Sequence, residues 1–402
     1  MVALVKILAV FLAVVLLLRT RLSITWLIAG GAIALGFLFH VDARAIAGVF
    51  GRSLSDGKTL ELVAVLYLIA LLEAVLRHSG WLKRLTESFL GLVRRPVWSA
   101  SLLPALLGLL PSAGGARFSA PLVASVLEDQ SVEARDKVVA NYWFRHLWEM
   151  VLPLYPGLIV AAVVSGFTLK DFVLCQWHYP FILFFSGWLN VWMGKKLPRS
   201  GGRRGGVGRL LALTWPVILP VAAVLLLARV QLVLLAAMSV TVGAVILYLR
   251  LSGRELARLS WEAFKPSIIL VVAAVMIFKN MLEETHSIID VNQFLQARGV
   301  PLAVIFFALP FLVGLLTGVT QAYVGITFPL LAPLAASTGA PLPYYSFAYM
   351  AGFIGVMLSP THLCLILTAE YFKTRLGQVY PRLIRTALLP LAVIILSLLL
   401  TM

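Results

Sequence analysis

Two stretches of this sequence decide its fold: Gly108-Leu-Leu-Pro-Ser-Ala-Gly-Gly-Ala-Arg117 and, 206 residues later, Gly314-Leu-Leu-Thr-Gly-Val-Thr-Gln-Ala-Tyr323. Each interrupts an apolar run with small and hydroxyl residues, and each is followed by an apolar run that contains a proline, Pro121 or Pro329. Backbone groups freed by such a break must meet protein, water or a ligand, because lipid offers them no hydrogen bonds. A matched pair of breaks in the two halves of a chain indicates a transporter binding site.

The composition is that of a protein that crosses the membrane many times. Of 402 residues, 61% are hydrophobic and 12% are charged, and the mean hydropathy is +0.98. Ordinary globular domains contain about 25% charged residues. The formal net charge of +16 would indicate a nucleic-acid partner in a soluble protein. Here the basic residues lie between apolar runs, which is typical of membrane topology, so no nucleic-acid partner is expected.

The cysteines and the amino terminus add two further expectations. Cys175 and Cys364 fall in unrelated positions, which predicts neither a disulfide framework nor a metal cluster. The first apolar run resembles the core of a signal peptide. Arg19 and Arg21 follow it instead of a small-residue cleavage site, so we interpret it as the first membrane span.

Apolar runs that can cross about 30 Å of hydrocarbon occur ten times, and two of them contain prolines that break the helix. The stretches 97–127 and 303–336, which hold the two quoted motifs, have arms too short to cross alone and therefore predict re-entrant hairpins. The ten expected spans cover residues 3–18, 22–40, 59–76, 138–164, 177–194, 210–228, 231–249, 266–284, 344–372 and 381–401.

The same offset relates other parts of the chain. Leu76-Arg-His-Ser-Gly80 corresponds to Leu282-Glu-Glu-Thr-His286, and Leu152-Pro153-Leu-Tyr corresponds to Ser359-Pro360-Thr-His after one inserted residue. We therefore expect an all-α polytopic membrane protein made of two repeats, residues 1–194 and 210–402. Each repeat holds five spans, one of which is a broken helix (138–164 or 344–372), plus one re-entrant hairpin.

Five spans in each repeat make the two repeats inverted relative to each other. With both termini outside, most lysines and arginines fall in the loops that lie inside, as the positive-inside rule requires. Counting each hairpin as a full crossing weakens that bias. The basic, glycine-rich segment 195–209 is then a flexible cytoplasmic linker; a phosphate-binding loop is the weaker reading, because the segment lacks the P-loop pattern. The expected location is the cytoplasmic (inner) membrane.

The hairpin tips carry the first set of candidate substrate-binding residues. Glycines let the backbone approach a ligand closely, and hydroxyl and amide groups can hydrogen-bond it. Arg117 follows the first tip, and its planar fork suits a carboxylate or phosphate; the alternative is a structural ion pair. The candidates at the tips are Ser112, Gly114, Gly115, Arg117, Thr317, Gly318, Thr320 and Gln321.

The broken spans carry the second set. Arg145 and Glu149 are four residues apart, so on one helix they would share a face and form an internal ion pair. The alternative makes Glu149, with His146, a proton carrier that couples transport. In the second repeat, Thr361 and His362 are candidate substrate ligands, and His362 could instead be a packed, hydrogen-bonded core residue. Four residues mark the broken helices themselves: Pro153, Pro156, Ser359 and Pro360.

Glu73 and Lys279 occupy equivalent positions in the third span of each repeat. They could pair with each other across the two-fold axis or hold separate structural places; we favour a structural role.

This arrangement resembles the ion transporter superfamily. That group includes divalent-anion/sodium symporters, arsenite and sodium/proton antiporters, gluconate permeases and TRAP transporter large subunits, and the chain looks most like an uncharacterised integral membrane family within it. The resemblance covers the whole chain but is architectural. It implies that substrate binds between the hairpin tips and the unwound span segments, that the substrate is anionic, and that the protein forms homodimers. The sodium-coupled carboxylate members carry Ser-Asn-Thr at both tips. This chain does not, so the proton is the favoured coupling ion over sodium.

The sequence therefore predicts a secondary transporter of a small organic anion, with no cofactor and no metal. Neither an H-E-x-x-H nor a G-x-S-x-G motif with suitable partners occurs, so an enzyme is not expected. Two alternatives remain: a membrane-embedded enzyme that acts on a lipid-linked substrate, and a passive channel. The enzyme would need an acid, a base and a nucleophile clustered at one membrane depth.

Overall fold

The computed structural model consists of helices joined by short connections. It describes residues 2–17, 20, 22–93, 95–111, 115–128, 130–195, 197, 206–227, 230, 232–286, 301–338 and 342–401. Within these ranges there is no strand. The part of the linker between 198 and 205, the stretch 287–300 and the first hairpin tip from 112 to 114 lie outside the described residues.

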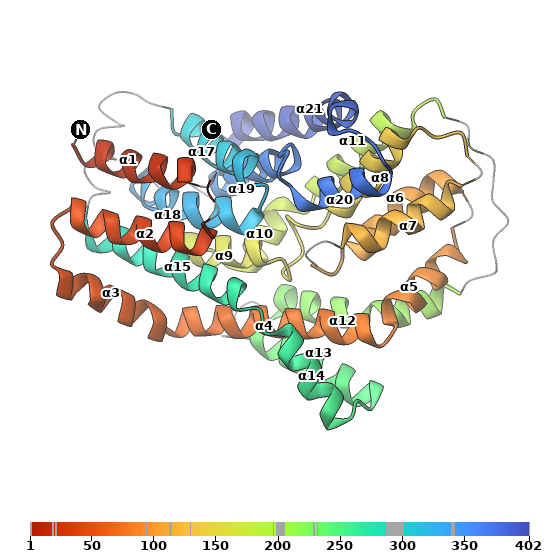
Figure 1. The fold of residues 1–402 in the computed structure, drawn as a ribbon, viewed down its shortest axis with the longest axis horizontal. Coiled ribbons are helices and arrows are strands. Elements are labelled where there is room, and N and C mark those ends of the chain that lie inside the picture. The colour runs from red at the N-terminus through yellow and green to blue at the C-terminus, as the bar shows by residue number, and fades with distance from the viewer. Residues whose placement is uncertain are drawn as a thin grey trace.

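Figure 1 shows how the described helices are arranged. Their bounds are α1 Val2–Leu17, α2 Ile24–Leu38, α3 Ala43–Ser55, α4 Gly57–His78, α5 Trp81–Leu90, α6 Pro96–Leu107, α7 Ala116–Val126, α8 Ala134–Arg145, α9 Pro156–Ser165, α10 Leu169–Gln176, α11 Tyr179–Trp192, α12 Val207–Leu226, α13 Val233–Leu249, α14 Gly253–Ala263, α15 Pro266–Glu284, α17 Leu302–Thr317, α18 Thr320–Thr338, α19 Leu342–Met357, α20 Leu363–Tyr371 and α21 Leu376–Thr401.

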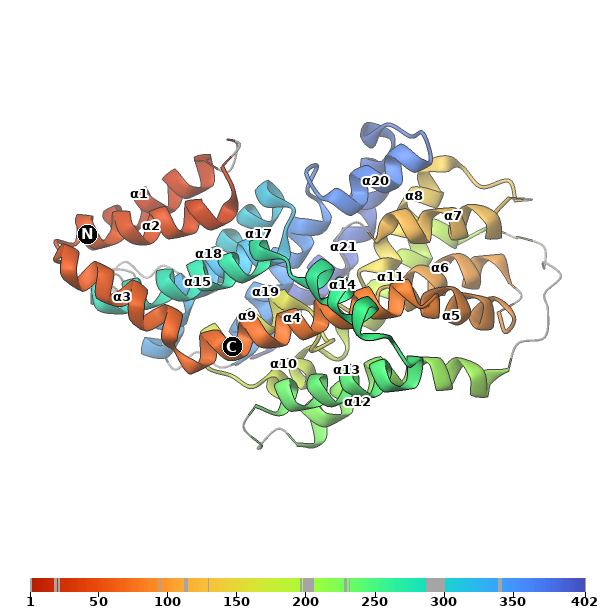
Figure 2. The ribbon, with the colours of Figure 1, turned by 60° about the horizontal axis from the view of Figure 1, so that its bottom comes forward.

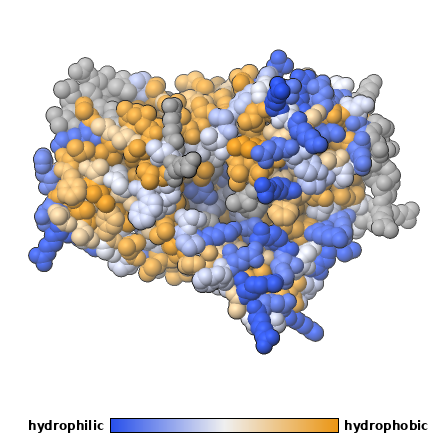
Figure 3. Space-filling model, in the orientation of Figure 1, coloured by the Kyte–Doolittle hydropathy of each residue, from blue (hydrophilic) through white to orange (hydrophobic). Residues whose placement is uncertain are grey.

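The long apolar helices confirm a helical membrane protein. Among the described residues α4, α12 and residues 376–397 of α21 are long and apolar enough to cross a bilayer, and α9 followed by 169–192 forms a further apolar pair bent by 113°. Shorter apolar helices include α2, α6, α13 and α17. The surface agrees: Figure 3 shows apolar residues over much of one face, with hydrophilic residues gathered on one side and around the protruding α14.

Three short amphipathic helices lie outside the expected spans and hairpins. α3, α5 and α14 each combine apolar and charged residues on opposite faces. α14 begins at a capping box, in which the Ser252 hydroxyl accepts from the Glu255 backbone N–H and the Glu255 carboxylate accepts from the Ser252 N–H. This pairing satisfies two backbone donors at the helix start. Figure 2 shows α14 lying across α4, with α12 and α13 on the adjacent side.

Both broken spans are interrupted where the prolines predicted. The first span stops at Arg145 and resumes at Pro156, and the second stops at Met357 and resumes at Leu363. Pro156 occupies the first turn of α9, where its missing N–H leaves no bond unmade. Because α8 ends at Arg145, the expectation that Arg145 and Glu149 share one helical face is wrong. Glu149 belongs to the non-helical break.

Each hairpin packs against parts of both broken spans. α6 packs on α8 and α7 on α20, whereas α17 packs on α19 and α18 on α9. In Figure 1 the two hairpins accordingly lie on opposite sides of the breaks. The first arm of each hairpin thus contacts the broken span of its own half, and the second arm contacts the broken spans of both halves. The breaks of the two spans are held together between the hairpins as a result.

The first glycine of each quoted motif lies very close to the backbone of the neighbouring broken span. A Cβ on Gly108 would lie 2.1 Å from the Arg145 carbonyl oxygen, and a Cβ on Gly314 would lie 2.3 Å from the Gly352 carbonyl oxygen. Real Cβ atoms do not approach backbone so closely. Gly352 is the counterpart of Arg145 once the inserted residue is counted. Both hairpins therefore need a glycine where they touch their broken span.

We expect Gly314→Ala to destabilise the protein, because its new methyl group would overlap the backbone of α19. Overpacking of this kind costs about 1–3 kcal/mol. The measurement is the melting temperature of purified protein in detergent. The matched control is Gly243→Ala in α13, where the Cβ would meet nothing within 4 Å; replacing a helical glycine there stabilises by about 0.5–1 kcal/mol. Equal melting temperatures for the two variants would contradict the close packing of α17 on α19.

Candidate functional site

A cavity of about 300 Å³ lies where the second hairpin tip meets both breaks. Its lining includes the start of α9, the start of α18 and the start of α20, together with charged residues of α4, α8 and the loop before α15. Pro111, at the edge of the first hairpin tip, also lines it. The lining residues that the sequence predicted are His146, Glu149, Pro156, Gly318, Thr320, Gln321, Thr361 and His362.

Gly318 brings the second hairpin tip against the second break. It ends α17 with a φ of 64°, the left-handed conformation that favours glycine at a helix end. A Cβ at this residue would lie 2.7 Å from the His362 backbone nitrogen. On the other side of the cavity Gly157 packs against Thr320, whose methyl carbon would lie 2.4 Å from a Cβ there. The starts of α9 and α18 are therefore in direct contact.

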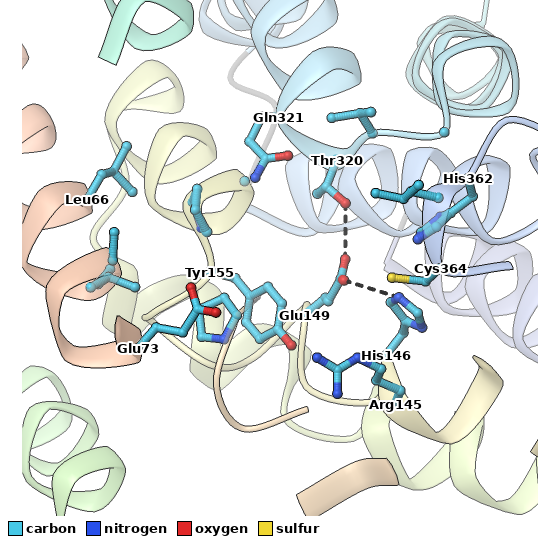
Figure 4. A pocket seen from close by; sticks show the side chains of 18 of the residues that line it. Leu66, Glu73, Arg145, His146, Glu149, Tyr155, Thr320, Gln321, His362 and Cys364 are labelled. Atoms are coloured by element: carbon cyan, nitrogen blue, oxygen red, sulfur yellow. Dashed lines mark hydrogen bonds and ion pairs between the residues drawn. The ribbon is translucent and has the colours of Figure 1, made fainter. Parts of the chain in front are cut away.

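Glu149 lies at the centre of the cavity wall (Figure 4). It is 9% exposed. The Thr320 hydroxyl donates to one carboxylate oxygen at 3.0 Å, and His146 Nε2 lies 3.9 Å from the other. These contacts join the first break to the second hairpin, because Glu149 and His146 belong to the first half of the chain and Thr320 to the second.

Two histidines and a cysteine form a cluster beside Glu149. Ligand atoms of His146, His362 and Cys364 all lie within 4.8 Å of one another, and the three residues are buried. The two imidazole rings are nearly perpendicular, with centroids 4.9 Å apart. In Figure 4 the Cys364 sulfur lies between the two rings. The cysteine positions predicted no metal cluster; the fold nevertheless brings these three residues, two of them far apart in the sequence from the third, close together.

Two cationic side chains and one tyrosine line the cavity although they were not predicted as site residues: Arg145, Lys265 and Tyr155. Arg145 is 5% exposed and lines the cavity at the end of α8. Lys265 contacts Glu73 at 3.6 Å, and Tyr155 donates to the Gly108 carbonyl oxygen at 2.5 Å. Lys279 pairs instead with Glu283 at 2.7 Å on its own helix, so the considered pairing of Glu73 with Lys279 is wrong.

Several predicted site residues lie elsewhere. Arg117 is exposed on α7 and does not line this cavity. The Thr317 hydroxyl donates to the Val313 carbonyl oxygen within α17, so it points back along its own helix. Gly115 precedes α7. Pro153, Ser359 and Pro360 shape the two breaks but are not part of the cavity lining, and Ser112 and Gly114 lie outside the described residues.

Two tyrosines connect the breaks in a reciprocal way. Tyr142 on α8 donates to the Met357 carbonyl oxygen, where α19 ends, and Tyr349 on α19 donates to the Glu149 carbonyl oxygen in the first break. Both bonds measure 3.0 Å. Each tyrosine therefore satisfies a backbone acceptor freed by the opposite break, which lipid could not do.

The arrangement combines a binding cavity with groups that can hold charge. Three helix amino termini, with their partial positive charge, face the cavity at Pro156, Thr320 and Leu363. Arg145 adds a full positive charge, Glu149 and the two histidines can hold or release a proton, and the histidine–cysteine cluster has donor atoms suited to a transition metal.

Comparison with known proteins gives a family and no activity. None of the curated proteins matches the chain. A family model described as "Protein of unknown function (DUF401)" matches residues 3–401, almost the whole length, and the chain therefore belongs to the DUF401 family.

Proposed function

We propose that this protein is a secondary active transporter of a small organic anion, carboxylate-like, that works by alternating access in the cytoplasmic membrane and is coupled to protons rather than sodium. The observation that carries the proposal is the convergence of three helix amino termini and Arg145 on one cavity inside an apolar chain. Half-helix amino termini point at anionic groups in transporters built from broken helices.

Contacts that recur at the 206- to 207-residue offset support this proposal. The close approaches of Gly108 and Gly314 and the donor tyrosines Tyr142 and Tyr349 occupy corresponding positions in the two halves. A two-fold relation of this kind lets one set of contacts open as its counterpart closes. The site would then be reached alternately from the two sides, with residues 195–209 in the cytoplasm and both termini outside.

Anion recognition would combine charge with directed hydrogen bonds. Arg145 offers a planar fork that matches a carboxylate, and Gln321 and the backbone of the α18 start offer donors on the facing wall. The cavity volume of about 300 Å³ is at the lower end of ligand pockets, which suits a small solute. Apolar lining residues such as Leu66 and Ile69 would contact its uncharged part.

Glu149 is the proposed proton carrier, with His146 beside it. A carboxylate at membrane depth is expensive unless it is paired or neutralised, so binding a proton or a solute there changes the energy of the site. Sodium-type coordination by a Ser-Asn-Thr tip has no counterpart in the sequence. The charged or titratable groups around Glu149 are Arg145, His146, Tyr155, Tyr349, His362, Cys364 and the Glu73–Lys265 pair.

A membrane-embedded enzyme remains the second candidate, and one observation favours it. Cys364, His146 and Glu149 place a nucleophile, a base and an acid around one cavity, which is the cluster such an enzyme would need. A lipid-linked substrate would then bind in the same cavity that the transporter proposal assigns to a free anion. Stabilisation by polyprenyl phosphate or phospholipid head groups, with no stabilisation by soluble anions, would favour the enzyme.

The first test is a thermal-shift screen of purified protein against carboxylates, sugar acids and oxyanions, at several pH values and with or without sodium. A ligand that binds the folded state raises apparent stability by mass action. We expect an anion to stabilise the protein in a pH-dependent way without requiring sodium. Stabilisation that requires sodium would overturn proton coupling, and no stabilisation by any anion would overturn the anion assignment.

We expect Arg145→Gln to weaken binding of the anion found in this screen by about 10- to 100-fold, because a charge-assisted hydrogen bond contributes about 1.5–3 kcal/mol. The matched control is Arg117→Gln, which alters an exposed arginine outside the cavity and should leave binding unchanged. Binding is measured by calorimetry, and the melting temperature of each variant without ligand monitors folding. Loss of binding in Arg117→Gln but not in Arg145→Gln would contradict this assignment and indicate that Arg117, at the first hairpin, contacts the substrate.

We expect Glu149→Gln to abolish accumulation driven by a pH gradient while exchange of solute across the membrane continues, because the amide keeps the shape of the side chain but cannot carry the proton. Uptake and counterflow into proteoliposomes measure the two activities. Glu283→Gln is the control, since this carboxylate pairs with Lys279 at the surface of α15. Normal accumulation in Glu149→Gln would remove Glu149 from coupling.

A further inference from the structure

The cluster of His146, His362 and Cys364 has the geometry of an assembled ligand set. Its ligand atoms lie within 4.8 Å of one another. A tetrahedral Zn²⁺ site, with bonds of about 2.0–2.3 Å, holds its ligand atoms about 3.3–3.8 Å apart. Small rotations of three side chains would therefore close the cluster around an ion. His146 lies in the first break, His362 at the end of the second and Cys364 at the start of α20, so an ion here would bridge the two halves of the chain.

Hydrogen bonds already fix both imidazole rings in the form that ligates metal. His146 Nδ1 donates to the Tyr142 carbonyl oxygen at 2.6 Å, and His362 Nδ1 donates to the Val356 carbonyl oxygen at 3.2 Å. A carbonyl oxygen can only accept, so the proton of each neutral ring is on Nδ1 and the lone pair is on Nε2. Metal-binding histidines are oriented by such second hydrogen bonds to backbone carbonyls. The His146 Nε2 also faces the Glu149 carboxylate.

Charge at the cluster also permits a divalent ion. Cys364 is the second residue of α20, where the amino end of the helix stabilises negative charge on sulfur. A Cys364 thiolate and the Glu149 carboxylate would together balance a charge of two. Arg145 opposes the ion, and it lies on the side of the cavity away from His362 in Figure 4. Three protein ligands leave a fourth position open toward Glu149 and the cavity.

We propose that His146, His362 and Cys364 form a binding site for a transition metal ion of the Zn²⁺ class, with the fourth position at Glu149 or open to the cavity. Imidazole and thiolate donors suit zinc, cobalt and copper, whereas magnesium and calcium prefer oxygen ligands. The site is a property of the folded chain and does not depend on the transport proposal.

The test is a cobalt titration of purified full-length protein carrying Cys175→Ser, after a chelator has removed bound metal. Cobalt bound to a thiolate gives an intense charge-transfer absorption, so the signal requires the remaining cysteine, Cys364. We expect saturation at one cobalt per chain, displacement of the signal by Zn²⁺, and no competition from excess Mg²⁺. Absence of a saturable signal would overturn the proposal.

Variants locate the site. Cys364→Ser should remove the charge-transfer signal, and His146→Ala and His362→Ala should each weaken cobalt binding at least ~10-fold. His178→Ala is the matched control, because this histidine precedes α11 and does not belong to the cluster. Equal cobalt affinity in His362→Ala and His178→Ala would place the metal elsewhere and overturn the assignment.

A second measurement avoids variants of the cluster altogether. In the Cys175→Ser protein, Zn²⁺ should slow the reaction of Cys364 with a small thiol reagent at least ~10-fold, and Mg²⁺ should not. Unchanged labelling with Zn²⁺ would contradict the proposal even if the cluster variants fail to fold. The anion screen on metal-free protein tests the proposed function separately, so failure of either proposal is distinguishable from failure of the other.

Discussion

The structure depends on one constraint: backbone groups freed by two helix breaks must find partners without water. Each break leaves carbonyl and amide groups that an intact helix would pair, and lipid cannot satisfy them. The hydroxyls of Tyr142 and Tyr349 supply partners from the opposite span. Neither break can therefore form without the other nearby. This mutual requirement explains why the hairpins press both broken spans together through glycine contacts with no room for a side chain.

Satisfying the breaks also creates the site. Where α9, α18 and α20 begin, their free amide ends face inward instead of toward lipid, and a cavity lined by three helix starts follows from the packing. Side chains just before or after these starts then face one another across the two halves. Thr320 reaches Glu149 in this way, and His362 reaches His146. The chemistry of the cavity is a consequence of how the two halves complete each other.

Local patterns predicted the elements, whereas long-range contacts decided which residues meet. Glycine, proline and hydroxyl residues at the breaks act through the backbone, so their positions predicted where the helices are interrupted. Arg117 and Arg145 look alike in the sequence, each following or ending an apolar run; only the packing of α8 on α6 places Arg145 at the cavity and leaves Arg117 exposed. Cys364 gave no signal of its own. Its place two residues after His362, just past a break matched to that of His146, was the available clue.

Two buried carboxylates show where function is to be sought. Asp136, fully buried at the start of α8, is paired with both Lys195 and Arg382, so its charge is balanced by two cations and serves to tie the first half to α21. Glu149 is nearly as buried, but its side chain accepts from a neutral hydroxyl and lies 3.9 Å from an imidazole, with Arg145 as the nearby cation. Burying a charge is costly unless it is well paired. The two cations that pair with Asp136 fit a structural role, whereas the position of Glu149 at the cavity is the reason that the proposed function assigns the changeable charge to it.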